Sequence, residues 1–102
     1  MVLNLNMRNC KSSFWVTVPG TQRKLPVTVI CGGNPGKTML ITAGVHCCEY
    51  VGVEAISLLA KELDSEKVFG NVVMIHCIDY LGFLQHNRDK IPEDQKNLNK
   101  VF

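Results

Sequence analysis

The chain has 102 residues, of which 46% are hydrophobic and 20% charged, and its net charge is +2 at pH 7. This composition is ordinary for a folded globular protein and unlike that of a disordered one. Its lysines and arginines are scattered, which predicts no nucleic-acid partner and no membrane-surface partner. No apolar run approaches the roughly 20 residues that span a bilayer, so we expect no membrane segment.

The five cysteines are an odd number, and their spacing matches neither a disulfide framework nor paired zinc knuckles. Cys31 and Cys77 lie within apolar, strand-like runs, where a free thiol behaves as a small hydrophobic side chain. Free thiols indicate a reducing compartment, so we expect a cytoplasmic protein.

The first third of the chain predicts an antiparallel pair of strands. Residues 13–19 and 25–31 are rich in β-branched and aromatic residues and are separated by the turn sequence PGTQRK. A second turn, GGNPGK, precedes a nearly continuous apolar strand at 38–44. Continuous apolar strands are typical of a sheet that is buried on both faces.

A helix is expected from about Glu49 to Leu63, because apolar residues recur there at three- and four-residue spacing. A buried-type strand follows at 71–78, and the polar sequence from Asp79 onward is interpreted as a loop. Strand, helix and strand in this order form a βαβ unit with parallel pairing. The predicted class is therefore α/β: antiparallel N-terminal strands leading into a βαβ unit of a mixed sheet, in a single incomplete α/β domain over 1–102.

The strongest candidate for chemistry is the sequence AGVHCCEYVG, where the strand at 38–44 meets the helix. His46 and Glu49 are three residues apart at the carboxyl end of a strand, where ligand crevices form in open α/β sheets. Imidazole nitrogen and carboxylate oxygen are both good Zn²⁺ ligands. The helix dipole alone also favours an acid in a first helical turn, so both interpretations stay open.

Other polar residues suggest weaker hypotheses. Cys47 and Cys48 could be metal ligands or a redox pair, although they lack CxxC spacing and small turn residues are the simpler interpretation. His76 is expected to be a hydrogen-bonded core histidine within a strand, and His86 has no partner at a suggestive spacing. The sequence 87–102 carries cationic and amide groups that suit a carboxylate-bearing substrate or a solvated loop.

Two ordered stretches, ITAGVHCCEYVGVEA and IDYLGFLQHNRDKIPEDQKNLNKVF, have the form of known motifs. The first resembles a strand, G-x-H-G-x-E and helix segment, and the second resembles a later N-P-x-G-F … R … P-x-D-G-x-N-L-N-R-x-F segment. Both belong to the succinylglutamate desuccinylase/aspartoacylase family, relatives of the zinc carboxypeptidases. The resemblance covers roughly residues 38–102, and two ordered motifs are more specific than either alone. It implies the N-terminal part of a zinc-carboxypeptidase-like (phosphorylase/hydrolase-like) fold.

The resemblance further implies hydrolysis of an N-acyl amino acid or related amide by metal-activated water. It implies that His46 and Glu49 are the first two ligands of one Zn²⁺ ion. It implies that Arg88, Asn99 and Lys100 bind a small-molecule substrate, with Asn99 and Lys100 on its carboxylate and Arg88 polarising its scissile carbonyl. The family's third zinc ligand and its catalytic glutamate lie downstream, so the resemblance places no catalytic residue within this chain. We expect the chain alone to have little or no activity.

Several residues depart from the family pattern. Cys47 and Gln95 replace glycines, and Lys100 replaces an arginine. Asp79 and Tyr80 stand in place of Asn-Pro. One alternative is therefore a non-catalytic remnant or interaction module that self-associates through an unfinished sheet edge. Another is a thiol-based redox protein that uses the two adjacent cysteines.

Overall fold

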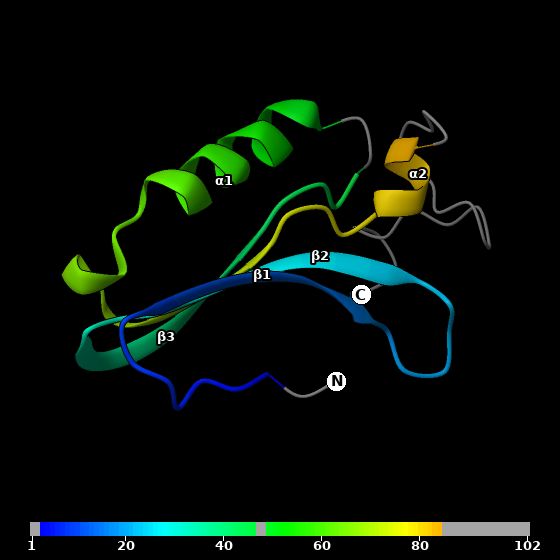
Figure 1. The fold of residues 1–102 in the computed structure, drawn as a ribbon. Coiled ribbons are helices and arrows are strands. Elements are labelled where there is room, and N and C mark those ends of the chain that lie inside the picture. Colours follow the sequence, from blue (N-terminus) through cyan, green and yellow to red (C-terminus); the bar gives the residue numbers. More distant parts are fainter. Residues whose placement is uncertain (1–2, 47–48, 85–102) are drawn as a thin grey trace.

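The computed structural model describes residues 3–46 and 49–84. Their strands form one mixed sheet in the order β1–β2–β4–β3. The elements are β1 (Cys10–Thr17), β2 (Lys24–Cys31), β3 (Asn34–Thr42), α1 (Tyr50–Glu62), the 3-10 helix η1 (Ser65–Lys67), β4 (Phe69–Ile75) and α2 (Tyr80–Leu84). Helix α1 lies across one face of this sheet, and the N-terminal segment lies on the other (Figure 1).

The antiparallel pair predicted for the first third of the chain is confirmed. β1 and β2 pair in continuous register from Cys10 opposite Cys31 to Thr17 opposite Lys24. The turn between them contains Gly20 at φ +77°, a left-handed conformation that glycine adopts without a steric penalty. β2 pairs with β4 on its other side, so it is a central strand.

The predicted βαβ unit is also confirmed, because β3 and β4 are parallel and α1 connects them. The helix was expected from Glu49 to Leu63 and is observed one residue shorter at each end. Its apolar face contributes Ile56 and Ala60 to a cluster with Ile30 and Met74 of the sheet, both of which are 0% exposed. Burial of each such isoleucine or methionine contributes about 1.5–3 kcal/mol.

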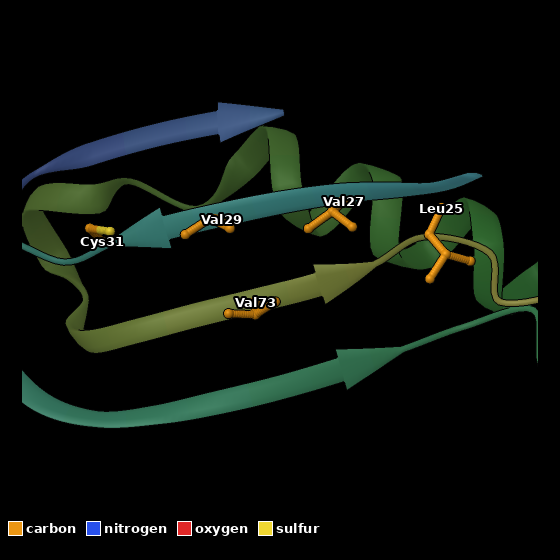
Figure 2. Packing of buried hydrophobic residues seen from close by; sticks show 5 residues of the cluster. All are labelled: Leu25, Val27, Val29, Cys31 and Val73. Atoms are coloured by element: carbon orange, nitrogen blue, oxygen red, sulfur yellow. The ribbon is translucent and has the colours of Figure 1, made fainter. Parts of the chain in front are cut away.

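A second core lies on the opposite face of the sheet. Alternate residues of β2 project to that face, where they pack with one residue of β4. Figure 2 shows the five members of this cluster, Leu25, Val27, Val29, Cys31 and Val73. Leu3 and Leu5 of the N-terminal segment pack against them. β2 therefore buries side chains on both of its faces.

The prediction that the apolar strand at 38–44 is buried on both faces is wrong for the part of the chain that the structure describes. β3 is an edge strand there, and Met39 and Leu40 are 60% and 62% exposed. The sheet order places β2 and β4 in the centre, and an apolar sequence by itself does not specify that order. β3 also begins at Asn34, inside the expected turn, with a register irregularity before Thr38.

The interpretation of the sequence from Asp79 onward as a loop is wrong over its first turn, where α2 forms. The carboxylate of Asp79 accepts a hydrogen bond from the backbone N–H of Gly82 (3.2 Å), and the Tyr80 ring packs on Trp15 of β1 with ring centroids 4.9 Å apart. Short helices without apolar periodicity depend on such local and tertiary contacts. Neither α1 nor α2 is long and apolar enough to span a membrane.

Asp79 forms a buried ion pair with Arg23, which precedes β2. Their side chains are only 2% and 16% exposed, and Arg23 Nη2 lies 3.1 Å from Asp79 Oδ1. Arg23 also donates through Nη1 to the carbonyl oxygen of Ile78 (3.0 Å). A Cβ at Gly82 would lie 2.4 Å from Asp79 Oδ2, so only glycine fits beside the carboxylate. The aspartate that departs from the Asn-Pro motif is thus matched by a cation.

We expect Arg23→Met to lower the free energy of unfolding by about 3 kcal/mol, because it leaves the Asp79 carboxylate buried without its cation. Chemical denaturation followed by circular dichroism measures the change. The double variant Arg23→Met/Asp79→Asn should recover much of the loss, because it removes both charges.

Lys24→Met is the matched control, because Lys24 is an exposed neighbour with the same charge. Its effect should stay within about 0.5 kcal/mol. Equal destabilisation by the two single variants would show that the buried pair contributes nothing specific.

Candidate metal centre

The loop that carries the candidate ligands starts where β3 and β4 end together. The backbone N–H of Ile78 donates to the carbonyl oxygen of Ala43, and that of Asp79 donates to Gly44, each at 2.9 Å. Gly44 has φ +64°, and a Cβ there would lie 2.7 Å from Cys77 Sγ. The left-handed conformation and the close approach of Cys77 both require glycine at this position. The conformation of Gly44 turns the chain out of the sheet toward His46.

His46 and Glu49 are brought together as the sequence predicted. His46 Nδ1 lies 3.4 Å from Glu49 Oε2, and the backbone N–H of His46 donates to Glu49 Oε1 at 3.0 Å. The His46 side chain is 21% exposed and that of Glu49 is 53% exposed, so solvent and small ligands reach the pair.

Glu49 lies at the start of α1, where an acidic residue could also serve the helix itself. Glu49 is the N-cap residue of α1, yet within the described residues its side chain makes no capping hydrogen bond to the helix. Its carboxylate instead contacts the backbone and ring of His46. Helix capping therefore does not explain the orientation of this carboxylate.

The pKa of Glu49 is lowered below its ordinary value of 4.5. The largest cause is the hydrogen bond from the backbone N–H of His46, and the ring of His46 lowers the pKa further by hydrogen bonding and charge, while partial burial raises it. Glu49 is consequently ionised at neutral pH. Carboxylates must be deprotonated to bind metal ions, so this state suits a ligand.

The donor pair fits a tetrahedral zinc ion. Two ligand atoms bound tetrahedrally by bonds of about 2.0–2.2 Å lie about 3.4 Å apart. His46 Nδ1 and Glu49 Oε2 have that separation. Among residues 3–46 and 49–84, no group of three or more histidine, cysteine, aspartate or glutamate side chains could hold a metal ion. The described residues thus supply two ligands at most, and a third remains a prediction.

A hollow of about 460 Å³ lies between β3 and α1, and Glu49 is part of its lining. The hollow is open because three of its lining residues, Ala43, Gly52 and Ala55, have side chains too small to fill it. Gly52 and Ala55 belong to α1. The pair is therefore adjacent to open space that a small molecule or another part of a protein could enter.

The remaining predicted site residues lie outside the described residues. They are Cys47, Cys48, His86, Arg88, Asn99 and Lys100. Arg23 was not singled out from the sequence, although the aspartate in place of the motif asparagine was a signal of a buried cation nearby.

A sequence model of the succinylglutamate desuccinylase/aspartoacylase catalytic domain matches residues 35–102. The chain belongs to this family. It is 36% identical over 78 residues to N-alpha-acetyl-L-2,4-diaminobutyric acid deacetylase of Halomonas elongata, in an alignment that covers 76% of this chain and 22% of that protein. The predicted family resemblance is confirmed, and this is a family of deacylases.

Solved structures of this family share the fold. The succinylglutamate desuccinylase/aspartoacylase of Rhodobacter sphaeroides matches with a TM-score of 0.80 at 27% identity, over 100% of this chain and 33% of that chain. An aspartoacylase family protein of Mesorhizobium loti gives 0.81 at 31% identity, over 98% and 32%. The product-bound ectoine utilization protein EutE (DoeB) of Ruegeria pomeroyi gives 0.76 at 25% identity, over 98% and 32%.

These matches confirm the predicted fold class, a mixed α/β sheet of the zinc-carboxypeptidase-like type. The chain of this family member spans about a third of the solved relatives and 22% of the Halomonas deacetylase.

His76 was expected to be a hydrogen-bonded core histidine within a strand, but it lies one residue beyond β4 and is only half-buried, so its predicted placement is wrong. The expected hydrogen bonding is observed, because both ring nitrogens have hydroxyl partners. Thr28 Oγ1 is 2.7 Å from Nε2, and Ser57 Oγ is 3.2 Å from Nδ1. Ser57 also donates to the carbonyl oxygen of Val53 (3.0 Å). These partners hold the neutral ring, and partial burial lowers the pKa of His76 below its ordinary value of 6.5.

The free energy of unfolding should depend on the protonation of His76. Because its pKa is lower in the folded state, the unfolded chain takes up a proton at higher pH than the native chain does. The contribution is fully present above about pH 6.5 and is lost as the pH falls below that value. In chemical denaturation, we expect wild type to lose more stability between about pH 7.5 and about pH 5.5 than His76→Gln does.

Glutamine keeps an oxygen that can accept a hydrogen bond from Thr28 but does not titrate in this range, so it is a suitable replacement. An equal loss of stability in wild type and variant would contradict the assignment.

Proposed function

We propose that this chain forms part of a zinc-dependent hydrolase that cleaves an N-acyl amino acid or a related amide by metal-activated water. His46 and Glu49 are two protein ligands of one Zn²⁺ ion in this proposal. The observation that carries it is the 3.4 Å separation between His46 Nδ1 and Glu49 Oε2, which suits adjacent corners of a zinc tetrahedron. Membership in a deacylase family supports the reaction class.

The chain's own residues prepare this site. The backbone N–H of His46 holds Glu49 Oε1, which leaves Oε2 directed at the imidazole and available to a cation. The hydrogen bond between Asp79 N–H and Gly44 fixes the loop two residues before His46. When bound, a zinc ion supplies polarisation of the scissile carbonyl and lowers the pKa of a water molecule.

For the substrate, we propose a small N-acylated amino acid that carries a carboxylate, bound through Arg88, Asn99 and Lys100. Support comes from a relative whose name describes deacetylation of an N-acetylated diamino acid. Lys100 in place of the family's arginine would provide a point charge rather than a bidentate fork. A cytoplasmic location suits the free thiols of Cys10 and Cys31.

Replacing either proposed ligand should weaken zinc binding strongly. Loss of outer partners of zinc ligands costs about 10–100-fold in affinity, so loss of a ligand in His46→Ala or Glu49→Gln should cost at least about tenfold. Competition with a chromophoric zinc chelator measures the affinity of the purified protein.

Glu62→Gln is the matched control, because it makes the same change at the exposed far end of α1. Zinc affinity unchanged by His46→Ala would overturn the ligand assignment. The third ligand and the catalytic glutamate are proposed to come from outside the chain, so turnover of N-acyl amino acids by the metal-loaded 102-residue chain would contradict that part.

A second candidate function, self-association, is favoured by the edge strand β3. Met39 and Leu40 project to opposite faces of the sheet and are 60% and 62% exposed. Within the described part of the chain, no strand pairs with the outer edge of β3. An exposed apolar edge is a template for strand addition, and two copies of one edge can pair about a two-fold axis. We therefore propose a second copy of this chain as the occupant.

In that case Leu40→Lys should shift the chain toward the monomer, because a charge on the edge opposes strand addition. Sedimentation equilibrium over a range of concentrations measures the association constant. Leu58→Lys on the exposed side of α1 is the matched control and should leave association unchanged. A monomer at every concentration in the wild type would rule out this candidate.

A further inference from the structure

Two cysteines that belong to neither candidate function lie opposite each other in the sheet. Cys10 of β1 is the direct partner of Cys31 of β2 in the antiparallel register. Directly opposite residues project to the same face, which here is the face opposite α1. Cys31 is 2% exposed within the cluster of Figure 2, and Cys10 is half-buried and packs against that cluster. Both are free thiols.

The backbone hydrogen bonds define the spacing of this pair. His76 N–H donates to the carbonyl oxygen of Pro26, so the even-numbered residues of β2 bond toward β4 and the odd-numbered ones, including Cys31, bond toward β1. Cys10 and Cys31 are therefore a hydrogen-bonded pair, whose Cα atoms lie about 5.5 Å apart in such ladders. Disulfides most often join Cα atoms about 5.5–6 Å apart.

The Cβ spacing is less favourable for a relaxed disulfide. Opposite Cβ atoms in antiparallel strands lie about 4.5–5.5 Å apart, with hydrogen-bonded pairs toward the wider end. A disulfide needs about 3.5–4.5 Å. A bond between these residues would therefore draw the strands together and store strain, and strained disulfides are the more easily reduced ones.

The two thiols also share open space. A hollow of about 150 Å³ lies between the N-terminal segment and the sheet, and Cys10 and Cys31 both line it, together with Asn4 and Met7. Among the residues that the structure describes, each sulfur has one long polar contact, at 3.7 Å from Ser12 Oγ for Cys10 and 3.9 Å from the Asn4 carbonyl oxygen for Cys31. Weak contacts beside open space leave both side chains able to change rotamer.

We propose that Cys10 and Cys31 form a reversible intramolecular disulfide that links the edge strand β1 to the central strand β2. The oxidant is a low-molecular-weight disulfide such as oxidised glutathione. The half-buried Cys10 thiolate attacks it, forms a mixed disulfide and releases one small thiol. The Cys31 thiolate then attacks the Cys10 sulfur and displaces the second small thiol. Two protein thiols are oxidised, one small disulfide is reduced to two thiols, and the two protein protons pass to them.

Tryptic mapping tests this proposal directly, because cleavage after lysine and arginine separates the relevant cysteines. Cys10 falls in the peptide 9–11 and Cys31 in 25–37, whereas 38–61 holds Cys47 and Cys48, and 68–88 holds Cys77. After treatment of the purified protein with oxidised glutathione and acid quenching, we expect peptide 9–11 linked to 25–37, lighter by two hydrogen atoms than the two peptides combined. Dithiothreitol should restore both thiols.

The matched control moves one thiol along the same face of β1. In the double variant Cys10→Ser/Ser12→Cys, the new cysteine is opposite Val29 and diagonal to Cys31, at about 7–8 Å, which is too far for a disulfide. This variant and Cys10→Ser should give no link to peptide 25–37. Glutathione adducts without the 9–11 to 25–37 link in the wild type, or equal linkage in the double variant, would overturn the proposal.

Discussion

Parallel pairing of β3 with β4 brings the carboxyl ends of two strands to one edge of the sheet. That pairing requires a crossover, and α1 supplies it while burying Ile56 and Ala60 against the sheet. Beyond the strands, backbone hydrogen bonds from Ile78 and Asp79 continue the pairing up to Gly44. The loop with the candidate ligands starts from these hydrogen bonds, so the placement of His46 and Glu49 depends first on the pairing of β3 with β4.

The Asp79–Arg23 pair extends this arrangement across the sheet. Arg23 comes from the connection between β1 and β2, and Asp79 follows β4, so their contact ties the antiparallel half of the fold to the parallel half. The same carboxylate accepts a hydrogen bond from Gly82 at the start of α2. Asp79, which departs from the family motif, is thus paired with the cation of Arg23, 56 residues away in sequence. This ion pair and the Gly82 hydrogen bond hold the beginning of the second motif in place.

The two faces of the sheet carry different chemistry. The face under α1 leads to the candidate ligand pair, His46 and Glu49, and to the hollow beside Glu49. The opposite face holds the Cys10–Cys31 pair beneath the N-terminal segment, on the side of the sheet remote from α1. The proposed disulfide on that face would change how β1 is attached to β2 and would not involve His46 or Glu49. Strand alternation explains the separation, because neighbouring residues of β2 project to opposite faces.

The sequence alone determined the α/β class, the βαβ unit, the family and the pairing of His46 with Glu49. Apolar periodicity, turn residues and the two ordered motifs were enough, because these features depend on residues that are close together in sequence. Only the tertiary structure decided that β3 lies at the edge, that α2 forms after Asp79, that Arg23 matches a buried carboxylate and that Cys10 faces Cys31. Strand order, register and buried ion pairs join residues distant along the chain, and local patterns do not specify such contacts.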